Sequence, residues 1–111
     1  MLVTAVVPPH RLDAVHDAAL DQGVPGVTVT DVQGFGRQGG HQAAYRGAEY
    51  DIEFVPKVRV DILVHHAAVK PLVDALVGAV RTGQIGDGKV WVSEVESVTR
   101  IRTGEVGPEA L

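Results

Sequence analysis

The chain has 111 residues, of which 45% are hydrophobic and 22% are charged, and these values are typical of a single globular domain. Its formal net charge of −4 argues against a nucleic-acid-binding protein, which needs a basic surface to neutralise phosphates. The lack of cysteine excludes disulfides and thiolate metal sites, and no apolar run approaches the roughly 20 residues of a membrane-spanning helix. We therefore expect a soluble, cytoplasmic protein.

The first half of the chain predicts a strand, a helix and a second strand. Residues 2–7 (LVTAVV) form an apolar run ended by two prolines, which indicates a buried strand. Residues 11–23 predict a helix with a glycine stop at Gly23 and an apolar stripe at Leu12, Val15, Ala19 and Leu20. Residues 27–33 (VTVTDVQ) alternate in the manner of a strand.

The second half repeats this plan. Residues 57–64 (KVRVDILV) alternate clearly and predict a third strand. Residues 69–83 predict the strongest helix of the chain, with apolar side chains at Val69, Leu72, Val73, Leu76, Val77 and Val80. Residues 89–95 (KVWVSEV) predict a fourth strand, and residues 99–105 (TRIRTGE) predict a short edge strand.

The order βαβ–βαβ predicts an α+β fold of the ferredoxin-like type, in which both helices cover one face of a four-stranded sheet. Residues 2–7 carry apolar side chains at both parities, so the helix-free face also needs a cover, and self-association is the economical way to provide one. We therefore expect a homo-oligomer. The irregular segment from Gly34 to Tyr50 separates the two halves, and long loops in small domains are usually functional.

The first candidate binding segment is GFGRQGG, residues 34–40. It contains G-x-G-x-x-G, but no helical stripe follows, so a dinucleotide fold is a poor interpretation. Its backbone can still direct N–H groups at an anion, and Arg37 and Gln38 add side-chain donors. Taken by itself, a flexible loop without a ligand would explain this segment better.

The second segment is TGQIGDGKV, residues 82–90. It resembles a P-loop, but Val90 stands where magnesium needs a hydroxyl, and a strand follows instead of a helix. A glycine-rich turn with Lys89 can still hold phosphate, and a plain hairpin turn is an equally good interpretation.

The third segment contains Arg100 and Arg102, which an extended strand would point to one side as a phosphate clamp. The alternative is a solvated strand edge that discourages aggregation. Three such segments in one short acidic chain together suggest a nucleotide polyphosphate.

Read together, these segments resemble the PII nitrogen-regulatory signal-transduction proteins. The resemblance rests on TVTDVQGFGRQGGH, YRGAEY, PKV, RTGQIGDGKVWV and RIRTGE in their order and spacing, and it runs from residue 2 to residue 111. It implies one ferredoxin-like domain over residues 1–111 that forms a homotrimer with nucleotide in the clefts between subunits. ATP and ADP would compete for that site, and 2-oxoglutarate would bind with Mg²⁺ and ATP.

The resemblance also assigns segments and residues. Residues 36–54 would be the T-loop, which touches regulatory targets, residues 82–89 a nucleotide-contacting loop, and residues 98–111 a C-terminal segment. Nucleotide would be held by Thr28, Gly34, Arg37, Leu63, Gly86, Asp87, Gly88, Lys89, Arg100 and Arg102. 2-Oxoglutarate would be held by Gly36, Gln38, Gly39, Gly40 and Lys57, with the Gln38 side-chain oxygen on magnesium.

Tyr50, in YRGAEY, stands where many bacterial members of the family are modified with a nucleotidyl group. Such a modification adds bulk and negative charge and would change how the T-loop docks. The target sequence leaves uridylylation, adenylylation and no modification open. The composition is rich in Ala, Val, Gly and Arg, as is typical of a GC-rich genome, and this weakly favours adenylylation over uridylylation.

Several positions depart from the usual family pattern. Pro8 replaces a basic residue and Gly39 replaces a lysine, so two positive charges that could support a dicarboxylate are missing. His10, Gln84 and Asp61 stand where Phe, Lys and Glu are common. We expect 2-oxoglutarate to bind more weakly here than in typical members.

The function implied by the resemblance is that of a non-enzymatic sensor. Its partners would be an ammonium transporter, which could recruit it to the inner membrane, a nucleotidylyltransferase and enzymes of nitrogen metabolism. A weak ATP-hydrolysing enzyme at the same clefts is the alternative, although no evident catalytic base supports it. A structural trimer without ligand is disfavoured by the three anion-binding segments.

Overall fold

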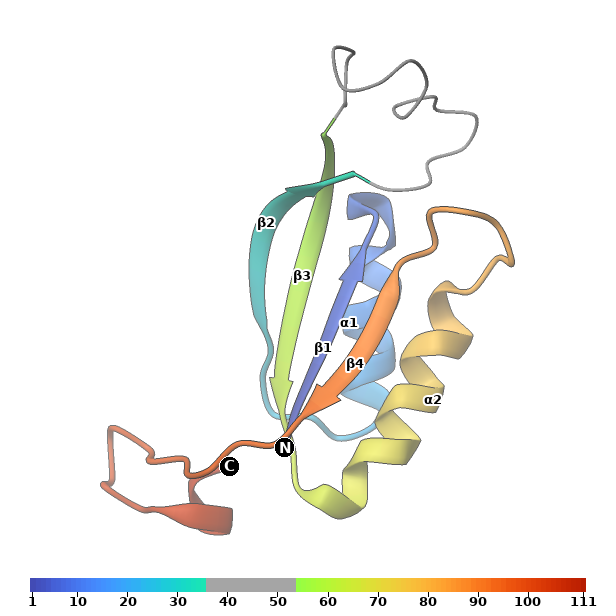
Figure 1. Cartoon of the computed structure of the whole chain (residues 1–111). Helices are drawn as coiled ribbons and strands as arrows, with labels where there is room; N and C mark the ends of the chain where they lie inside the picture. The colour runs from blue at the N-terminus through green and yellow to red at the C-terminus, as the bar shows by residue number, and fades with distance from the viewer. Residues whose placement is uncertain (36–53) are drawn as a thin grey trace.

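A computed structural model describes residues 1–35 and 54–111, which form a sheet covered on one face by two helices (Figure 1). The strands are β1 (Leu2–Val7), β2 (Thr28–Gly34), β3 (Val55–Leu63) and β4 (Lys89–Ser93), and the helices are α1 (Leu12–Asp21) and α2 (Val69–Val80). The strand order is β2-β3-β1-β4, and every neighbouring pair is antiparallel. The α+β class is confirmed, and this order is consistent with the ferredoxin-like arrangement.

The helices end for different local reasons. α1 stops at the predicted glycine, because Gly23 adopts a φ of 77° and a Schellman motif follows. In that motif the N–H of Gly23 donates to the carbonyl of Leu20 at 2.9 Å, and the N–H of Val24 donates to that of Ala19 at 3.1 Å. α2 ends three residues before its expected limit, since Arg81 is already extended. Neither helix of the described residues is long and apolar enough to cross a membrane.

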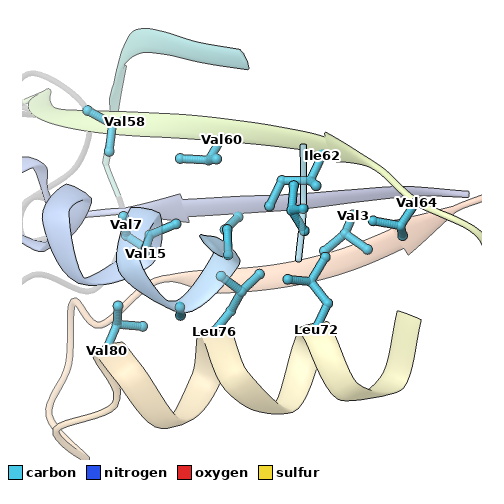
Figure 2. Close-up of a cluster of buried hydrophobic side chains, with 14 residues drawn as sticks. Val3, Val7, Val15, Val58, Val60, Ile62, Val64, Leu72, Leu76 and Val80 are labelled. Carbon is cyan, nitrogen blue, oxygen red and sulfur yellow. The ribbon is translucent and has the colours of Figure 1, made fainter. Parts of the chain in front are cut away.

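The core lies between the two helices and one face of the sheet (Figure 2). The central strands β1 and β3 place alternate residues on this face, so their core residues follow the period of two. The fully or nearly fully buried side chains include Val3, Val7, Val15, Val58, Val60, Ile62, Val64, Leu72, Leu76 and Val80. Burying each of them contributes on the order of 1.5–3 kcal/mol.

The prediction that Leu20 belongs to the apolar stripe of α1 is wrong, because this side chain is 56% exposed. At about 100° per residue, Leu20 lies roughly 140° around the helix from the buried Val15. Ala18, which is only 9% exposed, takes the core position instead.

The predicted edge strand over residues 99–105 is also wrong. Only an isolated bridge joins Thr99 to Val106, and residues 101–103 form a turn. The turn closes because Gly104 adopts a φ of 74° and donates its N–H to the carbonyl of Arg100 at 2.8 Å. The alternation of arginine and isoleucine therefore continues into a glycine turn and not along a sheet edge. The strand predicted over residues 89–95 likewise ends early, at Ser93.

The helix-free face of the sheet carries a polar network at its centre. Thr4 is fully buried and donates its hydroxyl to Asp61 Oδ1 at 2.7 Å, while Arg59 Nε donates to Asp61 Oδ2 at 3.0 Å. The guanidinium carbon of Arg59 lies 5.9 Å from the ring centroid of Trp91, which is 43% exposed. The face that the sequence expects to be covered thus combines exposed apolar side chains with one charged pair.

This network sets an expected pH dependence of stability. Burial raises the pKa of Asp61, but hydrogen bonds from Arg59 and Thr4 and the charge of Arg59 outweigh it and hold the pKa below its ordinary value of 3.8. Because the pKa of Asp61 is lower in the folded chain than its ordinary value of 3.8, the ionised carboxylate stabilises the fold above pH 3.8. This stabilisation is lost as the pH falls through the folded-state pKa.

We therefore expect Asp61→Asn to lower the free energy of unfolding by about 1–3 kcal/mol at neutral pH. The difference in unfolding free energy between this variant and the unmodified chain should narrow below about pH 4. Urea unfolding at fixed protein concentration across this range measures both effects. Asp31→Asn, at an exposed site on β2, is the matched control. A gap that stays constant with pH would contradict the role given to this carboxylate.

Candidate functional site

The loop between α2 and β4 is built around the carboxylate of Asp87. The N–H groups of Thr82 and Gly83 donate to Asp87 Oδ2 at 2.8 and 2.9 Å, and the Thr82 hydroxyl donates to Oδ1. These hydrogen bonds, first that from the Thr82 side chain, lower the pKa of Asp87 below its ordinary value. The carboxylate therefore serves as a scaffold that fixes the loop, and it remains ionised.

Glycines give this loop its shape. Gly83, Gly86 and Gly88 all have positive φ, and that of Gly88 is 106°. A Cβ built on Gly88 would lie 2.1 Å from the carbonyl oxygen of Val6, so the loop backbone rests directly on β1. Only glycine permits both this conformation and this approach.

A first group of predicted site residues gathers at this end of the sheet. Lys57 Nζ donates to the carbonyl of Gly86 at 3.4 Å, and Lys89 pairs with Val6 at the start of β4. Gly34 ends β2 two positions beyond the residue that pairs with Lys57. Next to them a cavity of about 190 Å³ is lined by Val7, Val77, Val80, Arg81, Asp87, Gly88, Lys89 and Val90.

A second group gathers at the opposite end. Thr28 and Leu63 line a cavity of about 550 Å³ together with Leu2, Pro25, Gly26, Val27, Asp61, Ala110 and Leu111. Arg100 is tied to this region because its Nη2 donates to the carbonyl of Leu111 at 2.9 Å. The sequence did not single out Pro25 to Val27, although the Pro-Gly turn after a glycine stop was a usable signal. No local signal could have placed Ala110 and Leu111 here.

The two groups do not meet within one chain. Thr28 and Gly34 stand at the two ends of β2, about 20 Å apart at the usual rise of a strand. In Figure 1 the C-terminal segment leaves the sheet beside the N-terminus, whereas the loop between α2 and β4 lies at the other end. We call these two groups the first and the second half-site, because the nucleotide site predicted from the sequence includes residues of both.

The two arginines are not the paired clamp that an extended strand would give. Arg100 is half-buried and bonded to its own segment, whereas Arg102 lies in the exposed turn of residues 101–103. Ile101 between them is 98% exposed. The two guanidiniums must therefore be considered separately.

The remaining predicted site residues lie outside the described residues: Gly36, Arg37, Gln38, Gly39, Gly40 and Tyr50. Residues 39–49 are polar and lack an apolar period, so the sequence predicts disorder there, and this stretch also lies outside the described residues. Directly at the boundary, the Phe35 and Phe54 rings meet edge to face, with centroids 5.5 Å apart and planes at 87°. Within residues 1–35 and 54–111, no three His, Cys, Asp or Glu side chains gather as a metal site.

Comparison with known proteins decides the family. The family model described as "Nitrogen regulatory protein P-II" matches residues 1–105 of this chain. The chain belongs to the P-II family. P-II proteins are regulatory signal transducers and not enzymes.

Relatives and a solved structure agree with this assignment. The Nitrogen regulatory protein P-II of Synechocystis sp. is 50% identical over 109 residues, covering 98% of this chain and 97% of that protein. Its counterpart in Mesorhizobium japonicum is 47% identical with the same coverage. The crystal structure of Arabidopsis thaliana PII bound to citrate superposes with a TM-score of 0.81 at 39% identity, covering 99% of this chain and 90% of that one.

The contact of Gly88 with β1 generates a prediction. Gly88→Ala should lower the free energy of unfolding by more than about 1 kcal/mol, because the new methyl group would collide with the Val6 carbonyl at an unfavourable φ. Gly78→Ala, in α2 with open space around its Cβ, should instead stabilise the chain by about 1 kcal/mol. Chemical denaturation of both variants measures the contrast, and equal stabilities would refute it.

Proposed function

We propose that this chain is a nitrogen and energy sensor that binds ATP or ADP competitively and binds 2-oxoglutarate together with Mg²⁺ and ATP. It acts on an ammonium transporter and on nitrogen-metabolism enzymes through the T-loop, residues 36–54. The observation that carries the proposal is the separation of two complementary half-sites at opposite ends of one sheet. Each half-site offers part of what a nucleotide needs, and neither offers all of it.

The first half-site suits the phosphates. Gly86, Gly88 and Lys89 supply backbone N–H groups and an ammonium on a loop already fixed by Asp87. Asp87 therefore supports the nucleotide indirectly, by shaping the loop. The second half-site suits the base and ribose, since its cavity combines apolar walls with the Thr28 hydroxyl. Arg100 is linked to that cavity through Leu111, and Arg102 follows it in the exposed turn of the C-terminal segment; both would add positive charge for phosphate.

A second copy of the chain would complete each site. The contact would join one end of the sheet to the other end of a neighbour, so it is head-to-tail, and such contacts form a ring where the rotation between neighbours closes. A homotrimer is the ring that we propose. The exposed Leu63 and Trp91 on the helix-free face supply apolar area for such an assembly.

For 2-oxoglutarate, Lys57 is the described residue that fits a carboxylate. Within the described residues, its ammonium makes one long contact of 3.4 Å, to the Gly86 carbonyl, and an anion bound beside the phosphate loop would offer a stronger partner. Gly36, Gln38, Gly39 and Gly40 would complete this site, with Gln38 on magnesium. Because Pro8 and Gly39 carry no charge, binding should be weaker than in typical family members.

The T-loop would transmit the bound state. ATP together with 2-oxoglutarate would favour one docking state of the T-loop and ADP another, because each ligand shifts the populations of these states. Tyr50 is the proposed target of a nucleotidylyltransferase. The protein would work in the cytoplasm and reach the inner membrane through the transporter.

Hydrolysis of ATP is not favoured as a second function. The carboxylate nearest the phosphate loop, Asp87, already accepts three hydrogen bonds from Thr82 and Gly83, and its lowered pKa makes it a weak base.

Calorimetric titration of ATP with Mg²⁺, with and without 2-oxoglutarate, tests the sensor function. We expect 2-oxoglutarate to tighten ATP binding by about 5-fold or more and to leave ADP binding unchanged. If ATP binds but 2-oxoglutarate has no effect, the chain senses only ATP against ADP. If neither nucleotide binds, the proposed function is wrong.

Mixed rings test the shared site. Lys89→Gln removes one phosphate-binding cation from the first half-site and Arg102→Gln removes one from the second, so each variant alone should bind ATP poorly. When the two variants are refolded together in equal amounts, about a quarter of the sites should combine two intact halves and recover normal affinity. Calorimetry gives the number of such sites, and light scattering gives the size of the assembly. Binding no better than that of the separate variants would show that each site lies within one chain.

A further inference from the structure

The segment that carries Arg100 is a closed loop with its own hydrogen bonds. The N–H of Arg100 donates to the carbonyl of Glu105 at 2.8 Å, and the N–H of Gly107 donates to that of Val98 at 2.9 Å. These bonds place residues 100 and 105 opposite each other, next to the bridge between Thr99 and Val106. The backbone therefore fixes where the side chain of Arg100 begins.

The side chain is then held at its far end. Arg100 Nη1 donates to Glu105 Oε1 at 2.9 Å, and Nη2 donates to the carbonyl of Leu111 at 2.9 Å. Glu105 Oε1 also accepts the hydroxyl of Thr103 at 2.9 Å, and that hydroxyl oxygen accepts the N–H of Glu105 at 3.2 Å. The guanidinium of Arg100 is thus hydrogen-bonded by two groups, the Glu105 carboxylate and the Leu111 carbonyl, and the carboxylate is in turn hydrogen-bonded by Thr103.

We propose that Glu105, supported by Thr103, is a positioning residue that presents Arg100 to the nucleotide phosphates; this role rests on the proposed function. A guanidinium has five N–H donors, and these contacts use two of them. Within residues 1–35 and 54–111, three donors remain for phosphate oxygens. Because the side chain is ordered before the ligand arrives, binding does not have to immobilise it.

Stability alone does not account for this contact. The side chains of Arg100 and Glu105 are 34% and 45% exposed, and ion pairs at such sites contribute little to folding. Glu105 also brings a negative charge near the expected phosphates, which by itself opposes binding. Its benefit must therefore come from orienting Arg100.

Two substitutions separate charge from orientation. Glu105→Gln and Glu105→Ala remove the same charge, but only glutamine keeps an oxygen that can accept the Arg100 Nη1 hydrogen bond. In calorimetric titrations with ATP, we expect Glu105→Gln to bind at least as tightly as the unmodified chain. Glu105→Ala should bind about three- to tenfold more weakly than Glu105→Gln.

The same pair is then compared in an Arg100→Ala background, where alanine and glutamine at position 105 should bind ATP equally. Thr103→Val, which removes only the supporting hydroxyl, should weaken binding about two- to threefold and tests the same role if Glu105→Ala does not fold. Melting followed by circular dichroism checks the fold of each variant.

Each other outcome has a distinct meaning. Equal ATP affinities of Glu105→Ala and Glu105→Gln would show that Glu105 acts only through its charge, and the positioning role would be overturned. A difference that persists without Arg100 would assign Glu105 to the fold of the segment and also overturn it. If the unmodified chain binds no ATP, the proposed function itself fails, and this role fails with it.

Discussion

The length of the central strands governs how this protein can work. Because β1 pairs antiparallel with β3 along its whole length, the loop beside Val6 and the cavity beside Leu63 are kept at opposite ends of a stiff sheet. No rotation of side chains bridges a distance of about 20 Å. Any ligand that needs both ends must therefore bind between two molecules, and assembly and ligand binding become parts of one equilibrium.

The placement of the acidic side chains explains how a chain of net charge −4 could bind the polyphosphate that we propose. Asp61, Asp87 and Glu105 each accept hydrogen bonds from close neighbours: Arg59 and Thr4, the backbone around Thr82, and Arg100 with Thr103. These carboxylates fix local structure, and their hydrogen bonds partly compensate their negative charges. In the proposed function, Lys57, Lys89 and Arg102 would set the local potential where a ligand enters. Net charge is thus a poor guide to local binding chemistry here.

The sequence predicted the strands and α2 well because their apolar periods are local and uninterrupted, as in residues 57–64. It misplaced Leu20, since a short helix with several alanines leaves its buried face ambiguous. It also misjudged residues 99–105, where alternation of Arg and Ile concealed a turn closed by Gly104 at positive φ. The division of the site into two ends could not be found from local pattern at all. It depends on strand order and register, which bring Thr28 beside Asp61 and the distant Leu111.

The aromatic contact between Phe35 and Phe54 has a consequence for how freely the intervening chain can change. This contact and the pairing of Gly34 with Val55 hold the two ends of the segment close together. The favourable free energy of these contacts offsets the entropy that is lost when the loop is closed. Loop-closure cost rises only with the logarithm of length, by about 0.6 kcal/mol for each doubling. Foreign recognition sequences of quite different lengths could therefore be grafted between the two rings at little expense to the folded sheet. The same tolerance would let partner choice diverge among related chains while the rest of the domain stays unaltered.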